Sequence, residues 1–407
     1  MIMRKRITAI IFLLVLLIGI IGYASIDKFI KPVAWQLIKG YSNNVMQEDS
    51  TSYDKVVNVR NRIEDFFKKE LYPKNVYINL YGAVNNVVGN KFIADANPLY
   101  NVVKLNNNYL VFVYPKSKNI AQYAQNLIEL NTYLKQKDIA LLYIQAPNKI
   151  NKFDNQLPTG VDDFTNSDAD EFLQTIRNSG VDTMDFREII HDNKINHFEM
   201  FFKTDHHWKP EAGLWATEKL SEKLVSDYNF KIDTQLYDPK NYNVEVKKNW
   251  FLGSLGKRVG LYYGGVDDIS IITPKFETNL EYIIPSKNID KIGSFENTLI
   301  DYDKISKRDY FTLSPYSFYT GGDFPLSSVI NNKLVSGKKI LLVRDSFACV
   351  VAPFLSLSCS ELDIIDLRHY TDSTLIKYID KTNPDIVIFL YNPSVYKTDD
   401  GKQFTFN

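Results

Sequence analysis

The chain has 407 residues, and its 48 Lys and Arg balance its 48 Asp and Glu, so the formal net charge is zero. A hydrophobic fraction of 45%, with 25 Phe and 26 Tyr, supports a large buried core and excludes an intrinsically disordered protein. The neutral composition lacks the clustered positive charge of nucleic-acid-binding proteins. Two cysteines, Cys349 and Cys359, are too few for a disulfide framework or a four-thiolate zinc site, and the sequence leaves open whether they pair.

A membrane segment is predicted at the N-terminus. Residues 7–24 form an uncharged, mainly aliphatic run directly after Arg4, Lys5 and Arg6. At ~1.5 Å per residue this run spans ~27 Å, which suits a thin bilayer, and a cleaved secretory signal is the alternative. We favour an uncleaved anchor over residues 1–25 because the run is longer than a typical signal core. The basic flank predicts a single-pass cell-membrane protein with its N-terminus in the cytoplasm and the remainder extracytoplasmic.

Two regions are predicted after the anchor. Residues 26–104 are expected to form a stalk and a small region with one helix, indicated by apolar spacing within residues 53–72, and short strands. Residues 105–407 alternate helical patterns with nearly continuous apolar strands. These strands are DIALLYIQAP, KKILLVRDS, LDIIDLR and PDIVIFLYNP. Strands without polar alternation are buried on both faces, which predicts one α/β domain with a parallel sheet flanked by helices.

The segment KTDHHWKPEAG, residues 203–213, is the first candidate for chemistry. Asp205 lies two residues before His207, and a carboxylate so placed can orient an imidazole and stabilise its charged form. Two alternatives stay open from the residues alone. One is metal ligation by His206 and His207, which needs a third ligand that the sequence does not indicate, and the other is a surface turn with a capping Asp. We predict no metal site.

The segment KKILLVRDSFACVVAPFL, residues 338–355, is the second candidate. An apolar strand runs into Arg344, Asp345 and Ser346, and a helical pattern follows. Ligands bind at the carboxyl ends of strands in open α/β sheets, so Ser346 stands where a nucleophile is expected. The arrangement resembles a nucleophile elbow without its flanking glycines. The structural alternative is that Asp345 or Ser346 only caps the helix.

Weaker candidates lie elsewhere in the chain. Two glycine-bearing loops, residues 250–260 and 318–325, allow a ligand to approach the backbone closely or supply N–H groups to an oxyanion. Asn392 follows another apolar strand, and aromatic rings such as those of Trp208, Tyr262 and Tyr263 are candidates to stack on sugars. The candidate substrate-binding residues are therefore Trp208, Arg344, Gly253, Gly321 and Asn392.

The combination of TDHHW with a later strand-end DSF resembles the DHHW family of bacterial exported proteins, and more distantly the SGNH-hydrolase-like domains of alginate O-acetyltransferases. The matching segments are KTDHHWKPEAG, FLGSL, FYTGG, LLVRDSFACVVAPFL, LDIIDLRHY and IFLYN, and they span roughly residues 105–400. The resemblance implies an SGNH-hydrolase-like fold and a triad of Asp205 as orienting acid, His207 as base and Ser346 as nucleophile. The chain departs from true SGNH hydrolases at Arg344, where those enzymes have Gly, and no segment supplies a clear oxyanion Asn.

These features lead us to expect a membrane-anchored, extracytoplasmic O-acetyltransferase that modifies a cell-surface or secreted polysaccharide and needs no cofactor. The resemblance implies that a multi-spanning membrane O-acyltransferase supplies the acyl groups. Two alternatives are a carbohydrate esterase with the same triad and a catalytically silent subunit that binds or assembles polysaccharide. The balanced charge favours a weakly charged sugar polymer as the partner over a polyanion.

Overall fold

The computed structural model describes residues 74–397 and 401–407, so the predicted anchor and the helix predicted within residues 53–72 lie outside the described part. No helix among the described residues is long and apolar enough to cross a membrane. The chain separates into two units, Met1–Lys74 and Asn75–Asn407, and the second carries the fold described below. The boundaries predicted after residues 25 and 104 stay predictions.

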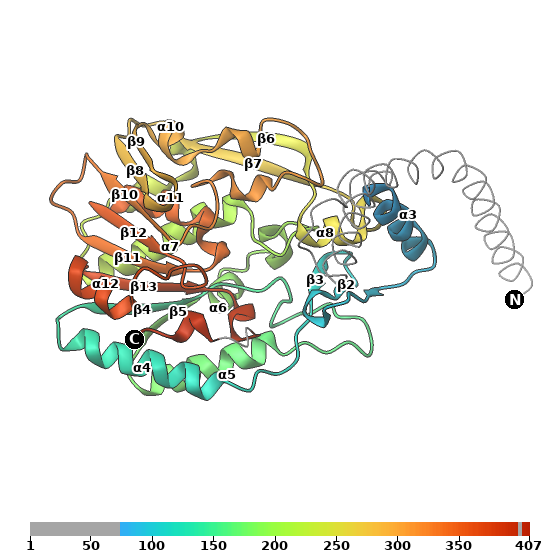
Figure 1. Cartoon of the computed structure of the whole chain (residues 1–407), viewed down its shortest axis with the longest axis horizontal. Coiled ribbons are helices and arrows are strands. Elements are labelled where there is room, and N and C mark those ends of the chain that lie inside the picture. Colours follow the sequence, from blue (N-terminus) through green and yellow to red (C-terminus); the bar gives the residue numbers. More distant parts are fainter. Residues whose placement is uncertain (1–73, 398–400) are drawn as a thin grey trace, which may run out of the picture. The chain divides into compact units, whose positions relative to one another are not determined.

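The centre of the fold is an eight-stranded sheet with the order β5-β4-β13-β11-β12-β10-β8-β9 (Figure 1). The first five strands are parallel to one another, whereas β10, β8 and β9 join antiparallel. Their bounds are β4 (Ala140–Gln145), β5 (Asp182–Asp185), β8 (Leu280–Ile284), β9 (Ile289–Gly293), β10 (Leu326–Asn331), β11 (Lys339–Arg344), β12 (Glu361–Ile365) and β13 (Ile386–Tyr391).

The prediction of an α/β fold flanked by helices is confirmed, and the predicted parallel sheet is found in part, because the sheet is mixed. The difference lies in residues 280–331, which contain none of the continuous apolar runs named above. Here β8 and β9 are joined by a short turn, Pro285–Lys287, and such a tight connection permits only antiparallel pairing. Four of the five parallel strands, β4, β11, β12 and β13, are the ones whose apolar runs were recognised in the sequence.

Two hydrophobic cores cover the two faces of the sheet, and alternate residues of each strand contribute to them. In β4, for example, Leu141 and Tyr143 belong to one core and Leu142 and Ile144 to the other. This two-sided burial explains why the central strands are continuously apolar. The helices of the first face are α4 (Ile120–Lys135), α5 (Thr165–Asn178) and α12 (Leu375–Thr382), and those of the second are α6 (Phe186–Asp192), α7 (Pro210–Tyr228), α10 (Phe295–Leu299) and α11 (Ala352–Leu355).

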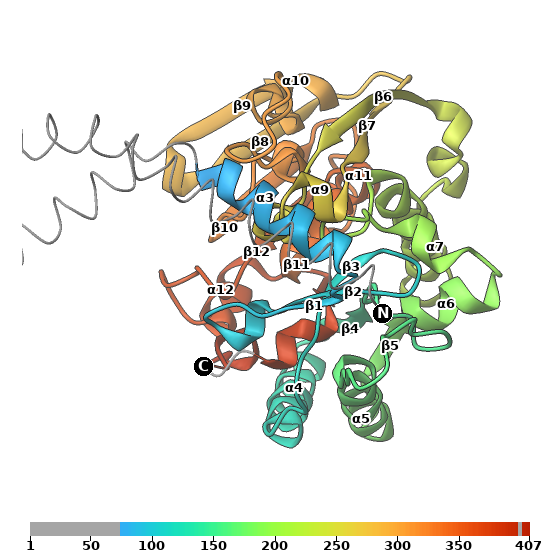
Figure 2. The ribbon, with the colours of Figure 1, turned by 90° about the vertical axis from the view of Figure 1, so that its right-hand side faces the viewer.

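Smaller elements complete the fold. Helix α3 packs against the short helices α8 and α9, beside a three-stranded sheet (Figure 2). The bounds are α3 (Lys74–Val87), β1 (Phe92–Ile93), β2 (Val102–Lys104), β3 (Leu110–Phe112), β6 (Tyr242–Phe251), α8 (Ser254–Val259), α9 (Leu261–Gly264) and β7 (Asp267–Pro274). Strands β6 and β7 form a separate antiparallel pair. Cys349 and Cys359 are both buried and free, so they do not pair.

The parallel strands position the site. The carboxyl ends of β4, β13, β11 and β12 meet at one edge of the sheet because the strands are parallel and in register. The chain leaves β11 at Asp345, and a short 3₁₀ turn, η8 (Ser346–Val350), follows immediately. Ser346 therefore stands at the edge where the sequence analysis expected a nucleophile.

Candidate active site

Ser346 is held by the capping interactions of its neighbour Asp345. One carboxylate oxygen of Asp345 accepts a hydrogen bond from the Phe347 N–H (2.8 Å), as a helix cap does, and the other accepts from the Asn392 N–H (2.7 Å). Because Asn392 follows β13, this buried carboxylate ties the ends of two adjacent strands together. Burial raises the pKa of Asp345. The capping role considered for Asp345 is therefore correct, while the Ser346 hydroxyl points elsewhere.

Asp205, His207 and Ser346 form one continuous hydrogen-bonded chain. The Asp205 carboxylate contacts His207 Nδ1 at 2.5 Å, and His207 Nε2 lies 2.7 Å from Ser346 Oγ. The carboxylate also accepts from the His207 N–H (3.0 Å) and the Ser254 N–H (2.6 Å). Burial opposes ionisation of Asp205, but nearby imidazole charge and these hydrogen bonds hold its pKa well below its ordinary value. The carboxylate is thus charged and oriented toward the ring.

Tyr316 fixes the plane of the His207 ring. The two rings stack with a centroid distance of 3.8 Å and an interplanar angle of 10°. The Tyr316 hydroxyl donates a hydrogen bond to the Ser346 carbonyl (3.0 Å), so one side chain contacts both the base and the backbone of the serine. Burial raises the pKa of Tyr316 well above its ordinary value, which keeps the hydroxyl protonated. The sequence analysis did not identify Tyr316, and its position in a loop, in the short turn η7 (Pro315–Phe318), gives no periodic signal.

His206 points away from Ser346. Its Nδ1 lies 2.8 Å from Ser254 Oγ, and its ring contacts the His207 ring at a centroid distance of 3.7 Å. Loss of hydration, followed by the charge of His207, lowers the pKa of His206 to about 3, so this ring is neutral near pH 7. Side-chain nitrogen and oxygen atoms of Asp205, His206 and His207 lie within 4.8 Å of one another, a spacing that suits a metal ion. The hydrogen bonds described above already engage these atoms, and we assign the cluster no metal role.

A buried lysine and a buried aspartate clamp the backbone of the turn that carries Asp205. The Asp267 carboxylate accepts from the N–H groups of Lys203 (2.6 Å) and Thr204 (2.8 Å) and from the Thr204 hydroxyl (2.5 Å). On the carbonyl side, Lys149 Nζ donates to the carbonyl oxygens of Leu110 (2.6 Å), Lys203 (3.3 Å) and Asp205. Burial lowers the pKa of Lys149 to about 7. The peptide groups before the triad acid are therefore held from both sides.

Neither member of this clamp was predicted from the sequence. Lys149 comes four residues after β4, at the same edge of the sheet as Ser346, and Asp267 is the first residue of β7. A lysine just beyond a fully apolar strand was a usable signal, because a strand end places it near the site. Nothing local marked Asp267, since its partners lie 63 or 64 residues away in the chain.

Gly253 permits the close approach of α8 to the turn. A Cβ atom on Gly253 would lie 2.2 Å from Asp205 Cβ and 2.4 Å from Asp205 Cα, so no other residue fits without displacing the acid. The Gly253 N–H donates to the Thr204 hydroxyl (2.8 Å) and is not available to a substrate. Gly253 is buried beneath Asp205, which corrects the substrate-binding role predicted for it.

Trp208 and Arg344 are also buried, which corrects their predicted roles in binding substrate. The Trp208 ring has no exposed face for a sugar, and its Nε1 donates to the Phe347 carbonyl (2.8 Å), joining the two halves of the site. Arg344 forms an ion pair with Asp323 and donates to the Gly322 carbonyl (3.1 Å), which fixes the FYTGG loop against the strand end. Both residues position the site from within the protein.

Gly321 and Asn392 are the remaining predicted substrate contacts. Gly321 has a φ of +74°, in the left-handed region that favours glycine, and lies in the loop that Arg344 holds. The Asn392 side chain is engaged, since its Nδ2 donates to the Pro147 carbonyl (2.8 Å) and its Oδ1 accepts from the Ser394 N–H (3.0 Å). Asn392 nevertheless lines a pocket beside the triad, so its contact with substrate stays a prediction.

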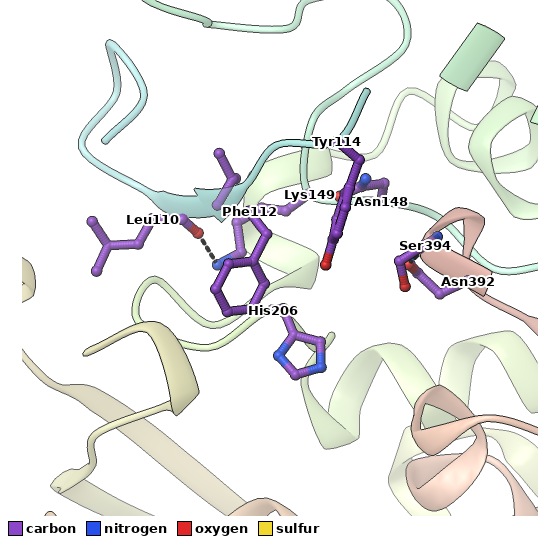
Figure 3. Close-up of a pocket in the computed structure, with 9 residues that line it drawn as sticks. Leu110, Phe112, Tyr114, Asn148, Lys149, His206, Asn392 and Ser394 are labelled. Atoms are coloured by element: carbon purple, nitrogen blue, oxygen red, sulfur yellow. Dashed lines mark hydrogen bonds between the residues drawn. The ribbon is translucent and has the colours of Figure 1, made fainter. Parts of the chain in front are cut away.

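This pocket lies next to His206 and is shown in Figure 3. The rings of Phe112 and Tyr114 extend into it above His206, and Ser394 and Asn392 form another side. The Phe112 ring is 5.9 Å from the His206 ring, and His206 in turn contacts His207. The pocket therefore presents aromatic and hydroxyl-bearing side chains near the proposed base, His207, with the His206 ring between them.

Part of the chain matches a known protein family. Residues 109–260, which include Asp205 and His207, match the family model described as an SGNH hydrolase-like domain of acetyltransferase AlgX. No curated protein sequence matches the chain significantly.

Several solved structures are similar to this chain, including the following three. Bacillus cereus PatB1 aligns over 78% of this chain and 99% of its own with 21% identity and a TM-score of 0.61. PatB1 with a sulfonyl adduct aligns over 75% and 99% with 20% identity and the same TM-score. A DHHW family protein from Eubacterium siraeum aligns over 77% and 96% with 16% identity and a TM-score of 0.54. The chain thus has an SGNH-like fold, and its resemblance to the DHHW family and to the SGNH-hydrolase-like acetyltransferase domain is confirmed.

Proposed function

We propose that this protein is an O-acetyltransferase that uses Ser346, His207 and Asp205 to move an acyl group onto a polysaccharide hydroxyl. The observation that carries the proposal is the unbroken chain of contacts from Asp205 through His207 to Ser346 Oγ. This is the geometry required for nucleophilic acyl transfer by a serine: a base on the hydroxyl and an acid on the far ring nitrogen. The match of residues 109–260 to an acetyltransferase domain supports the same reaction class.

In the first half-reaction, Ser346 Oγ attacks the carbonyl carbon of the acyl donor while His207 Nε2 takes the hydroxyl proton. Asp205, held in its charged form, stabilises the resulting imidazolium. The tetrahedral intermediate collapses, the donor alkoxide leaves with the proton from His207, and an acyl-Ser346 ester remains. The Ser346 N–H opens the turn η8, where backbone N–H groups lack a helical partner, and we assign it as a donor to the oxyanion.

In the second half-reaction, a sugar hydroxyl gives its proton to His207 Nε2 and attacks the acyl-Ser346 carbonyl. The new sugar ester departs, and Ser346 recovers its proton. Water in place of the sugar makes the same site an esterase. The pocket formed by Phe112, Tyr114 and Ser394 supports a sugar acceptor, because aromatic rings stack on sugar faces and hydroxyls bond to them.

We propose the cellular setting from the sequence. Residues 1–25 anchor the protein in the cell membrane, with the N-terminus in the cytoplasm and the catalytic domain outside. Acyl groups then have to cross the membrane, and a multi-spanning O-acyltransferase is the proposed supplier. The balanced charge of the chain supports a weakly charged polymer as the acceptor.

The test uses the purified full chain, a small activated acetyl ester and an oligosaccharide acceptor. The native protein should form acetylated oligosaccharide and Ser346→Ala should not, whereas the control Ser226→Ala, on the exposed surface of α7, should match the native protein. A sulfonyl fluoride should label the native protein at Ser346 only. Acetate without acetylated sugar would identify an esterase. If the native protein shows no turnover and no labelling, the result favours the silent polysaccharide-binding subunit. Equal turnover by Ser346→Ala would refute the serine assignment.

A further inference from the structure

Helix α3 presents its apolar side chains to the solvent. Seven residues form this outer face, and each is between 44% and 77% exposed. They recur at the spacing of one side of a helix. The residues of the α3 outer face are Val76, Tyr77, Leu80, Tyr81, Val84, Val87 and, just beyond the helix, Val88.

The opposite side of α3 is small and polar, and this is the side that packs on the protein. Gly82 approaches α8 so closely that a Cβ atom would lie 1.9 Å from the Val259 carbonyl oxygen. Asn79 Oδ1 accepts from the Leu261 N–H (2.8 Å), and Asn86 Nδ2 donates to the Tyr262 carbonyl (3.0 Å). An ordinary surface helix buries its apolar stripe and exposes its polar one. Helix α3 does the reverse, and these contacts fix it in that orientation.

The charge distribution of this segment is equally unusual. Residues 75–90 contain no charged side chain, and lysines stand at both ends of the stretch, Lys74 and Lys91. Two tyrosines lie in the outer face, and tyrosine is enriched where hydrocarbon meets polar headgroups. An exposed apolar patch of several contiguous side chains marks an interaction surface. The absence of charge disfavours a highly charged partner.

We propose that the α3 outer face docks on the surface of a lipid bilayer. The 73 residues that precede α3 end directly at its first residue, and they contain the uncharged run at residues 7–24 with its basic flank. The proposed anchor within residues 1–25 therefore places α3 on a chain that is attached to a membrane. The neutral apolar face and the lysines at its ends suit the boundary between acyl chains and headgroups. This inference does not depend on the reaction at Ser346.

The docking surface lies close to the active site in the fold. Helix α8, which packs against α3, begins at Ser254, and the Ser254 N–H donates to the Asp205 carboxylate. A protein docked through α3 therefore works with its catalytic turn near the bilayer. An acyl donor delivered at the membrane surface would reach Ser346 over a short path.

The test places a fluorescent probe on α3 in the full chain. Leu80→Cys, in the outer face, and Val335→Cys, an exposed residue in the turn between β10 and β11, are labelled with an environment-sensitive dye. The native Cys349 and Cys359 are buried and do not compete for a thiol reagent. The proteins are reconstituted with vesicles of phosphatidylcholine and phosphatidylglycerol that contain spin-labelled lipids with the quencher at a shallow or a deep position.

The probe at residue 80 should shift to the blue and be quenched by the shallow spin label, as expected for a face buried about 5–10 Å into the headgroup boundary. The probe at residue 335 should show neither effect. Adding Tyr77→Asp and Val84→Asp to the Leu80→Cys protein places charges in the outer face without touching the packed side, and quenching should fall to the level of residue 335.

Three outcomes overturn the proposal. Equal quenching at residues 80 and 335, or failure of the full chain to associate with vesicles, shows that α3 does not reach lipid. A blue shift without lipid quenching that disappears on dilution identifies a second copy of the chain as the occupant. The same shift persisting on dilution identifies another segment of this chain.

Discussion

The two halves of the candidate active site are positioned by different means. Ser346 follows a strand that is buried between two hydrophobic cores, so the sheet itself places the nucleophile. Asp205 and His207 lie in an irregular turn whose backbone is held by the charged side chains of Lys149 and Asp267. Apolar packing thus sets one half, and a buried polar clamp sets the other. The position of Ser346 depends on the packing of the sheet alone, whereas the position of the Asp205 and His207 turn depends also on the protonation of the side chains that hold it.

The largest decrease in activity should come from substituting His207, which contacts both Asp205 and Ser346. His207→Ala breaks the contacts to both Asp205 and Ser346, and loss of a triad base costs roughly a million-fold in kcat. His206→Asn, its matched control, removes a neutral ring that does not contact Ser346 and should keep most of the activity. Steady-state rates with a small acetyl ester measure both. An active His207→Ala beside an inactive His206→Asn would reverse the assignment.

An intermediate effect should come from the clamp. Lys149→Met removes the Nζ donor from three carbonyl groups, of which only the Lys203 carbonyl is known to keep another donor, the Leu110 N–H, and so loosens the turn. A misplacement of about 1 Å in a catalytic group costs on the order of 100-fold in rate. Lys152→Met, three residues along and partly exposed, is the control. If both variants keep the native rate, the turn does not need the ammonium.

The dependence of kcat on pH distinguishes a positioning role of Lys149 from a general loss of stability. The pKa of Lys149 is lowered to about 7, so rising pH removes a proton from Nζ near neutrality. The neutral amine has two N–H donors for three carbonyls, and kcat should therefore fall as pH rises through about 7. The groups that face Nζ are the Asp205 and Asp267 carboxylates, the His206 ring and the Tyr109 ring. Lys149→Met should lack this limb of the profile. A native profile that is flat above pH 7 would contradict the mechanism.

The smallest effect should come from Tyr316→Phe. The substitution keeps the ring stacked on His207 and removes the hydroxyl that donates to the Ser346 carbonyl (3.0 Å) and, at longer range, to the Phe347 carbonyl (3.4 Å), a contribution worth about 1 kcal/mol. We expect a few-fold decrease in kcat and a slightly lower free energy of unfolding, measured by urea denaturation. Tyr316→Leu removes the stacked ring as well and should cost clearly more. Equal rates for the two variants would show that the ring plane of His207 is set elsewhere.

The same contrast explains what could be predicted from the sequence. The parallel strands and the position of Ser346 follow from local apolar patterns, which a strand buried on both faces must show. The Asp205 and His207 pair was visible because the two residues are neighbours in the chain. The antiparallel strands β8, β9 and β10 escaped recognition because none is buried on both faces: buried and more exposed residues alternate along β8 and β10, and β9 has no fully buried residue, so none of them forms a continuous apolar run.

The errors in the site have one physical cause. Trp208, Arg344 and Gly253 were assigned to substrate because aromatic, cationic and glycine residues often contact ligands. The type of a residue does not reveal whether its side chain faces the substrate or the interior of the protein. In the fold these three point into the protein and support the triad. Lys149 and Asp267 were missed for the converse reason, since charged residues are ordinarily exposed and their burial follows only from tertiary packing.

The place of β13 in the sheet determines when the site can exist. This strand comes near the end of the chain, yet it inserts between β4 and β11, and Gln145 and Tyr391 contact each other across 246 residues. The Asp345 carboxylate that caps the serine turn also needs the N–H of Asn392. A chain still being synthesised or exported therefore lacks the central strand that aligns its nucleophile. Acyl-transfer activity should begin only after the last residues have been delivered and folded.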